Sequence, residues 1–161
     1  MKANEETKKN YLIVCVAGLV ILFSSIIWYY KCPIQAEDVL VGRDDVYEIH
    51  LIAYKGNNHM NYYNIEFKDS SKVERFIEVF SKSGYTRIPG SRNIANDGNY
   101  IMMAVVYGEN FNNNMVIVEV NDKGYLKVDA NTYKFTKNNT DIFNELYEML
   151  VVGNKPIEPE K

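Results

Sequence analysis

An uncharged run of 20 residues, Tyr11 to Tyr30, limits what this chain can form more than any other feature of its sequence. As an α-helix, a run of this length spans about 30 Å, which matches the hydrocarbon core of a bilayer. A core helix of a soluble protein keeps a polar stripe, and this run has none. The sequence therefore predicts a transmembrane helix over residues 11–30.

A cleaved signal peptide is the alternative interpretation of the same run. The apolar part of a signal peptide is usually about 7 to 15 residues long, which is shorter than this run. The best small-residue cleavage position follows Ala36, but it lies well beyond the run and has Ile34 where a small residue is preferred. The sequence favours a retained anchor and leaves cleavage open.

The charges that flank the run predict its orientation. Lys2, Lys8 and Lys9 precede it, whereas Lys31 alone follows it directly, before two acidic residues. Because basic residues stay on the cytoplasmic side, residues 1–10 should form a cytoplasmic tail. We predict a single-pass protein of the cell membrane that contacts the membrane through its helix and holds the rest of the chain extracytoplasmic.

The remainder of the chain has room for one folded domain. Hydrophobic residues make up 47% of the 161 residues, which is enough for a core. Residues 31–45 mix proline, glycine and acids and predict a tether. Residues 46–153 should form the extracytoplasmic domain, and residues 154–161, with their prolines and charges, a flexible tail.

Apolar periodicity predicts an α+β fold for this domain. Strands are expected at 46–54, 60–68, 99–107, 115–120 and 125–128, with weaker signals at 85–88 and 132–135. One helix should begin at a capping box from Ser71 to Glu74 and end at Gly84, and a second should cover 141–152. The predicted order is β-β-α-β-β-β-β-α, in which one of the two weak strands is counted. One antiparallel sheet should carry both helices on one face.

The first hairpin contains the only constellation that suggests metal chemistry. Pairing Tyr54 with Met60 places Glu48 opposite Glu66, with His50 two residues along on the same face. Two facing carboxylates repel unless a cation or a proton separates them, so these three residues are candidate metal ligands. A solvated polar face explains the pattern more simply, and the sequence predicts no cofactor.

Recognised catalytic and nucleic-acid-binding features are missing from the sequence. The folded part has no cysteine, and its serines fall in caps or loops outside any Gly-x-Ser-x-Gly setting. Phosphate loops, dinucleotide fingerprints and paired cysteine ligands do not occur. The net charge is −3 and the basic residues are scattered, which argues against nucleic acid as a partner.

The two central strands are apolar on both faces, so the face without helices needs a cover. That cover is either the 85–98 loop or the tether segment 39–41, or it is a partner that docks there. The side chains concerned, which are candidates for an interaction surface, are Ile101, Met103, Val105, Tyr107, Met115 and Ile117.

Two segments carry a resemblance to a known class of protein. Lys8-Lys9 precede the single apolar run, and Ile65-Glu66-Phe67-Lys68-Asp69 lead into Lys72-Val73-Glu74-Arg75-Phe76. The layout resembles small single-pass membrane-anchored proteins of Gram-positive bacteria with an outer domain of unknown function. This resemblance implies an architecture and no catalytic residue.

Two functions follow from these features. The first is a non-enzymatic, membrane-anchored extracytoplasmic module that binds an unidentified ligand or an envelope protein or peptide. The alternative is a cation-assisted envelope hydrolase centred on Glu48, His50 and Glu66.

Overall fold

In a computed structural model the chain divides into two compact units, Met1–Cys32 and Pro33–Lys161. The structure describes residues 2–40, 45–56 and 59–157. The predicted features at 41–44, in the hairpin turn at 57–58 and in the tail at 158–161 lie outside the described residues.

The first unit is one long helix, α1 (Lys2–Lys31). Its 22-residue part Asn10–Lys31 is long and apolar enough to cross a membrane. The helix begins before residue 11, so most of the segment predicted as a separate tail continues the same helix.

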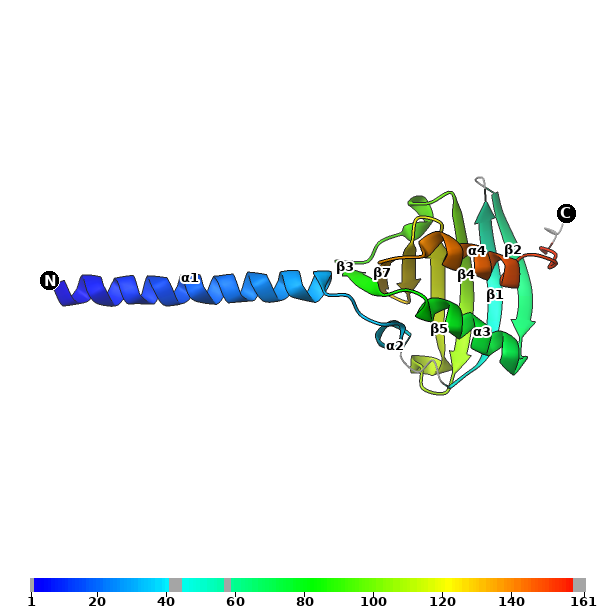
Figure 1. The fold of residues 1–161 in the computed structure, drawn as a ribbon, viewed down its shortest axis with the longest axis horizontal. Coiled ribbons are helices and arrows are strands. Elements are labelled where there is room, and N and C mark those ends of the chain that lie inside the picture. Colours follow the sequence, from blue (N-terminus) through cyan, green and yellow to red (C-terminus); the bar gives the residue numbers. More distant parts are fainter. Residues whose placement is uncertain (1, 41–44, 57–58, 158–161) are drawn as a thin grey trace. The chain divides into compact units, whose positions relative to one another are not determined.

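The second unit is built on one antiparallel sheet of seven strands (Figure 1). The strands are β1 (Val46–Gly56), β2 (His59–Phe67), β3 (Tyr85–Ile88), β4 (Tyr100–Gly108), β5 (Met115–Asn121), β6 (Tyr125–Val128) and β7 (Asn131–Phe135). Their order across the sheet is β2-β1-β4-β5-β6-β7-β3. The α+β class and the antiparallel sheet are confirmed.

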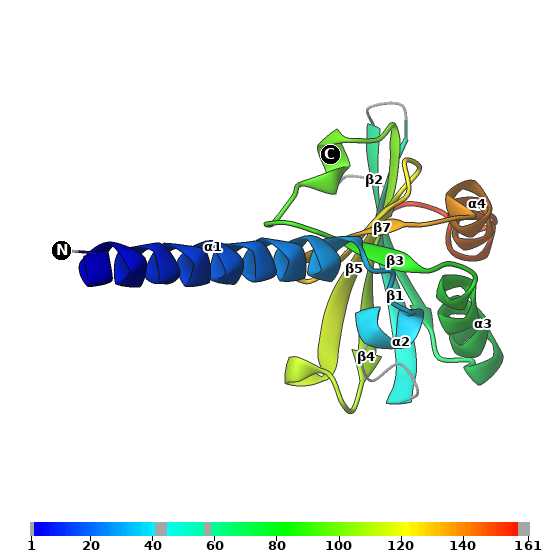
Figure 2. The same cartoon turned by 60° about the vertical axis from the view of Figure 1, so that its left-hand side comes forward.

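Two amphipathic helices, α3 (Ser70–Ser81) and α4 (Asn139–Leu150), lie side by side on one face of the sheet (Figure 2). The predicted element order is one strand short, because five strands separate these helices instead of four. Both weak strand signals, at 85–88 and 132–135, belong to real strands. Three further short elements are α2 (Ala36–Val39), η2 (Ile94–Asn96) and η3 (Asn112–Asn114).

The residue that caps α3 differs from the prediction. Asp69 is the N-cap, and its carboxylate accepts a hydrogen bond of 2.9 Å from the backbone N–H of Ser71. Asp69 competes well for this position because a carboxylate at a helix start also meets the positive end of the helix dipole. The buried residues Val73, Phe76 and Phe80 keep the predicted helical spacing.

The register of the first hairpin also differs from the prediction. Ile49 pairs with Phe67 and His50 with Glu66, which is a slip of two residues from the predicted pairing. A β-bulge between Leu51 and Ala53 takes up one residue, so the slip at the turn end is smaller. Up to Leu51 this slip of two keeps each side chain on its predicted face, so hydrophobic alternation alone does not detect it. Beyond the bulge the alternation is reversed, and Tyr54 packs on the helix side while Ala53 pairs with Met103 on the other face.

The segment predicted as a tether is partly built into the domain. Ala36, Val39 and Leu40 are buried in the core that lies between the sheet and the helices. The folded unit therefore begins at Pro33, well before residue 46.

Each of the two edge strands of the sheet forms backbone hydrogen bonds with a residue close to one end of the folded unit. Ile34 forms an isolated antiparallel bridge with Tyr85 of β3, with backbone hydrogen bonds of 2.8 and 2.9 Å. At the opposite edge, the backbone N–H of Ile157 donates to the carbonyl of Tyr62 in β2 at 2.8 Å.

Candidate functional site

The six apolar residues predicted as an interaction surface share one face of the sheet. The register places Val105 beside Ile117 and Tyr107 beside Met115, on the face opposite α3 and α4. Their exposure divides them, however. Ile101 and Val105 are buried, Met103 and Tyr107 are half-buried, and Met115 and Ile117 are 42% and 39% exposed.

The 89–98 segment covers the part of this face around Ile101. Ile94 is fully buried there, and its carbonyl accepts a hydrogen bond of 2.9 Å from the side chain of Asn121. Lys55 donates to the carbonyl of Ala95 at 3.2 Å and fixes the other side of the segment. Of the two internal covers expected, the 85–98 loop is the one found on this face, since Val39 and Leu40 pack on the helix side.

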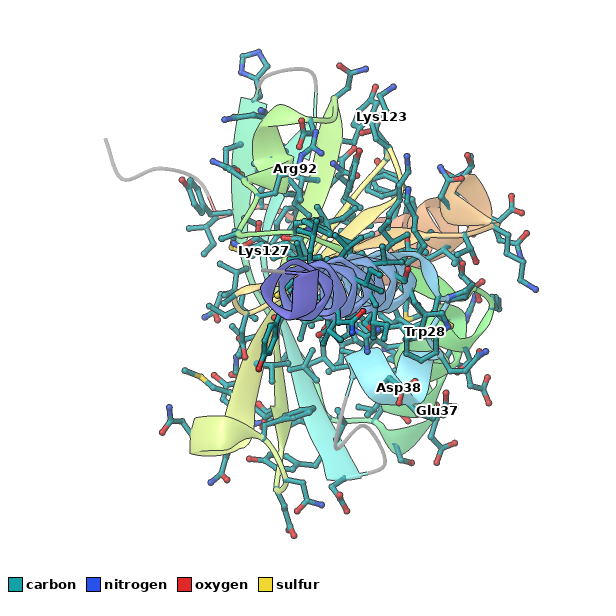
Figure 3. All side chains as sticks on the ribbon, turned by 90° about the vertical axis from the view of Figure 1, so that its left-hand side faces the viewer. Trp28, Glu37, Asp38, Arg92, Lys123 and Lys127 are labelled. Carbon is teal, nitrogen blue, oxygen red and sulfur yellow. The ribbon has the colours of Figure 1, made fainter. Side chains whose placement is uncertain are left out.

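The polar side chains around this face are largely paired with one another. Arg92 forms a two-point ion pair with Asp97, and its guanidinium lies 4.7 Å from the ring centroid of Tyr125. Lys127 Nζ lies 2.8 Å from Glu119 Oε1. Arg92 and Lys127 are labelled in Figure 3, on the 89–98 segment and on β6.

The predicted metal ligands do come together. Among the described residues, Glu48, His50 and Glu66 are the one group of three potential ligands that lie close together, with their donor atoms all within 4.8 Å of one another. His50 Nε2 hydrogen-bonds Glu48 Oε1 and lies 4.0 Å from Glu66 Oε1. The ring of His50 also packs against Tyr107, with ring centroids 4.8 Å apart.

A fourth residue, Lys68, was not among the predicted metal ligands but belongs to the same cluster. Lys68 Nζ lies 3.2 Å from Glu48 Oε1 and 2.9 Å from Glu66 Oε2. The hydrogen bond from His50, followed by the hydrogen bond and charge of Lys68, lowers the pKa of Glu48. The carboxylates in turn raise the pKa of Lys68. The ammonium of Lys68 therefore supplies the cation that these two neighbouring carboxylates require.

A different site lies beside α4, on the helix-covered face. A cavity of about 450 Å³ opens between the first half of α4 and the ends of β1 and β4. Four aromatic rings line it, those of Tyr54, Tyr100, Phe143 and Tyr147. Its polar lining consists of Asp122, Thr140 and Asn144.

The aromatic rings that line the cavity lie at different angles to one another. Tyr54 and Tyr100 are nearly parallel, with an interplanar angle of 17° and centroids 6.3 Å apart. Tyr147 is tilted by 51° to Tyr54, and Phe143 by 49° to Tyr100. The aromatic lining therefore forms a corner with walls in several orientations.

The turn between β5 and β6 holds Asp122 in place. Its Oδ1 atom accepts hydrogen bonds from the backbone N–H groups of Asn99, at 3.0 Å, and Tyr100, at 3.2 Å. A Cβ atom at Gly98 would collide with this oxygen. Glycine at this position thus allows the carboxylate to approach the start of β4.

Gly56 has a similar role for the rings. A Cβ atom there would lie 3.1 Å from Tyr54 Oη and 3.2 Å from a ring carbon of Tyr100. Such distances are tighter than ordinary van der Waals contact. The absence of a side chain at the end of β1 leaves room for the two parallel rings.

The phenol of Tyr54 is kept in its neutral form. Burial raises its pKa to about 12, with further contributions from Tyr147, Tyr100 and Asp122. The tyrosine is therefore protonated at physiological pH, and among the described residues that line the cavity only Asp122 carries a formal charge.

Sequence reasoning did not identify this cavity. Alternation predicts Tyr54 on the face of Glu48 and His50, and the bulge after Leu51 brings it to the helix side. Tyr100 fits the alternation of an ordinary strand, and Tyr147 lies on an amphipathic helix where an aromatic residue normally contributes to packing. The one feature of the sequence that could have suggested an aromatic cavity is its 13 tyrosines. That count does not show which of them lie together in the fold.

The sequence matches no protein-family model, no curated protein and no solved structure. The geometry of the domain is therefore the basis for a functional proposal.

Proposed function

We propose that this chain is a single-pass membrane protein whose extracytoplasmic domain is a non-enzymatic binding module, with the cavity beside α4 as its ligand site. The cavity is the observation that carries the proposal. Ligand pockets are typically concave, mostly apolar and lined by a few convergent polar groups, and their usual volume is about 300–1,000 Å³.

The anchor and its orientation rest on α1 and on the charges around it. The uncharged residues surround the helix on all sides, so lipid is the environment that accommodates them best. Lys8 and Lys9 precede the run, and Trp28, with the two tyrosines after it, provides the rings typical of a membrane interface. Pro33 follows the end of the helix and begins the folded unit.

A protein or peptide partner on the opposite sheet face has less support. Of the six candidate side chains there, Met115 and Ile117 are exposed, and the other four are half-buried or buried. Two such side chains fall short of the contiguous apolar area that distinguishes an interface from ordinary surface. The hydrolase alternative also has less support, because Lys68 pairs with both carboxylates that would hold the cation.

Thiol labelling of intact cells tests the topology. Cys15 lies within the apolar run and Cys32 directly after α1. A membrane-impermeant maleimide should label the Cys15→Ser variant and leave the Cys32→Ser variant unlabelled. In a variant without native cysteines, a reporter introduced by Asn131→Cys, at an exposed position of β7, should also be labelled from outside. Labelling of the Asn131→Cys reporter only after lysis would place the domain in the cytoplasm and overturn the proposed topology.

A further inference from the structure

The cavity beside α4 has a defined electrostatic character, which indicates the chemistry of its ligand. Asp122 is acidic, and no lysine or arginine lines the cavity among the described residues. The nearest cation recorded for Asp122 is Lys123, whose exposed Nζ atom lies 3.9 Å from Oδ2, beyond hydrogen-bond distance. A phosphate or carboxylate ligand would therefore meet a like charge and no strong donor.

The aromatic lining favours a cation for an independent reason. The face of an aromatic ring carries negative electrostatic potential, and it attracts an ammonium group within about 6 Å of the ring centroid. Tyrosine rings in the neutral form keep this character, and Tyr54, whose pKa is raised to about 12 by burial, is in that form.

The orientation of the rings distinguishes a compact cation from a flat ligand. A planar ring or a sugar stacks on one aromatic face at a time. A roughly spherical group can contact Tyr54 and Tyr147, which are tilted by 51°, at the same time. Phe143 and Tyr100 offer a second corner of nearly the same angle.

From the single carboxylate, the absence of lining cations and the angled rings, we infer that the cavity binds a small organic cation with a quaternary or alkylated ammonium group. The ammonium lies against the rings of Tyr54 and Tyr147 and is balanced by the carboxylate of Asp122. This inference rests on the proposed binding function and adds to it the class of ligand.

Calorimetric titration of the full chain, kept in an uncharged polyoxyethylene ether detergent, tests the inference. The probes are choline as the quaternary ammonium, N-acetylglucosamine as a neutral ligand and inorganic phosphate as an anion. We expect choline to bind and the other two to show no saturable binding.

Two matched variants test the role of the charge. Asp122→Asn keeps an oxygen that can accept from the backbone N–H groups of Asn99 and Tyr100, so the turn is preserved. Choline binding should weaken by about fivefold or more, as expected for loss of a partly exposed charge pair. Asp129→Asn removes the same charge from another turn, where Oδ1 accepts from Ile117 N at 2.9 Å, and should leave binding unchanged.

A second pair tests the rings and remains informative if Asp122→Asn does not fold. Tyr147→Phe retains the aromatic face and should bind choline as the unmodified chain does. Tyr147→Leu removes the ring and should weaken binding while the melting temperature shows that the domain is still folded. Equal choline affinity in the folded Leu and Phe variants would overturn the inference.

The probes also separate this inference from the function on which it rests. Saturable binding of N-acetylglucosamine or phosphate at the cavity, without binding of choline, would refute the cationic ligand and retain a binding module. No binding of any probe at concentrations well into the millimolar range would count against both the ligand class and the cavity as the ligand site.

Discussion

The ammonium nitrogen of Lys68 lies 2.9 Å from a carboxylate oxygen of Glu66. The same nitrogen reaches Glu48 across the hairpin at 3.2 Å. The charges of two neighbouring carboxylates are thus compensated by Lys68, the residue that follows β2. This arrangement decides how the cluster should respond to metal ions.

Removal of the lysine should create a metal site. In Lys68→Met, Glu48, His50 and Glu66 keep their positions but lose the internal cation, and two carboxylates with one imidazole form a ligand set suited to Zn²⁺. Zn²⁺ should raise the melting temperature of Lys68→Met and leave that of the unmodified chain unchanged. A further Glu66→Gln change should abolish the shift. An equal shift in the unmodified chain would show that metal displaces Lys68 and would favour the hydrolase.

Acid should weaken the contribution of Glu48 to stability. The pKa of Glu48 is lowered from its ordinary value of 4.5, first by the hydrogen bond from His50 and then by Lys68. A lowered pKa in the folded state means that the stabilisation is complete above that ordinary value and is lost as pH falls through the folded value. Glu48→Gln should therefore cost more stability at pH 7 than at pH 3 in urea unfolding. A cost that does not depend on pH would contradict this assignment.

Cross-strand neighbours on the open face should respond differently to a charge. Val105 pairs with Ile117, but Val105 is 8% exposed and Ile117 is 39% exposed. Val105→Lys buries an unpaired charge and should destabilise the domain by several kcal/mol, on the order of 3 or more. Ile117→Lys can extend its ammonium into water and should cost less than about 1 kcal/mol. Similar unfolding free energies for the two variants would show that Ile117 is also covered.

The side chain of Asn121 should matter for stability beyond its size. It is fully buried, donates to the carbonyl of Ile94 and accepts from the backbone N–H groups of Lys123 and Tyr125. Asn121→Leu leaves these groups without their partner and should cost about 2 to 3 kcal/mol in urea unfolding. Asn93→Ala, which removes an exposed cap of the same covering segment, should cost clearly less. Equal costs would mean that the buried bonds do not hold the segment.

The cap of α3 can be assigned by a pair of alanine variants. Asp69→Ala removes the carboxylate that accepts from Ser71 N, and should lower the free energy of unfolding by about 1 kcal/mol. Ser71→Ala removes only the hydroxyl that donates to the same carboxylate at 2.8 Å, and should cost less. A larger loss from Ser71→Ala would restore the capping box that the sequence predicts.

The sequence predicted the features of the fold that depend on spacing within one element, and missed features that depend on pairing between elements. The buried stripe of α3 and the alternation of β4 and β5 follow from spacing within single elements, and they were predicted correctly. The pairing of His50 with Glu66 was not, because a slip of two residues leaves both of these side chains on their predicted face. The bulge after Leu51, which moves Tyr54 to the helix side, leaves no signal in the alternation.

For the candidate sites too, the sequence predicted what local spacing determines and missed what depends on contacts between separate elements. Glu48 and Glu66 were placed on one face by alternation alone, but the contribution of Lys68 depended on a register that the sequence does not specify. The cavity required Tyr54, Tyr100 and Tyr147 from three separate elements to meet around one turn. Periodicity does not predict such a meeting, since Tyr100 and Tyr147 simply fit their own strand and helix. Tyr54 reaches the helix side only through the bulge after Leu51.

Two contacts should keep the edge strands from pairing with other copies of the chain. They are the bridge between Ile34 and Tyr85 and the hydrogen bond from Ile157 to Tyr62. If the chain is anchored in a bilayer as proposed, its copies meet one another often, and an unpaired edge strand would pair with the edge strand of a neighbouring copy. Here part of each outermost strand is already engaged by the chain itself, so copies crowded in two dimensions are discouraged from polymerising strand to strand.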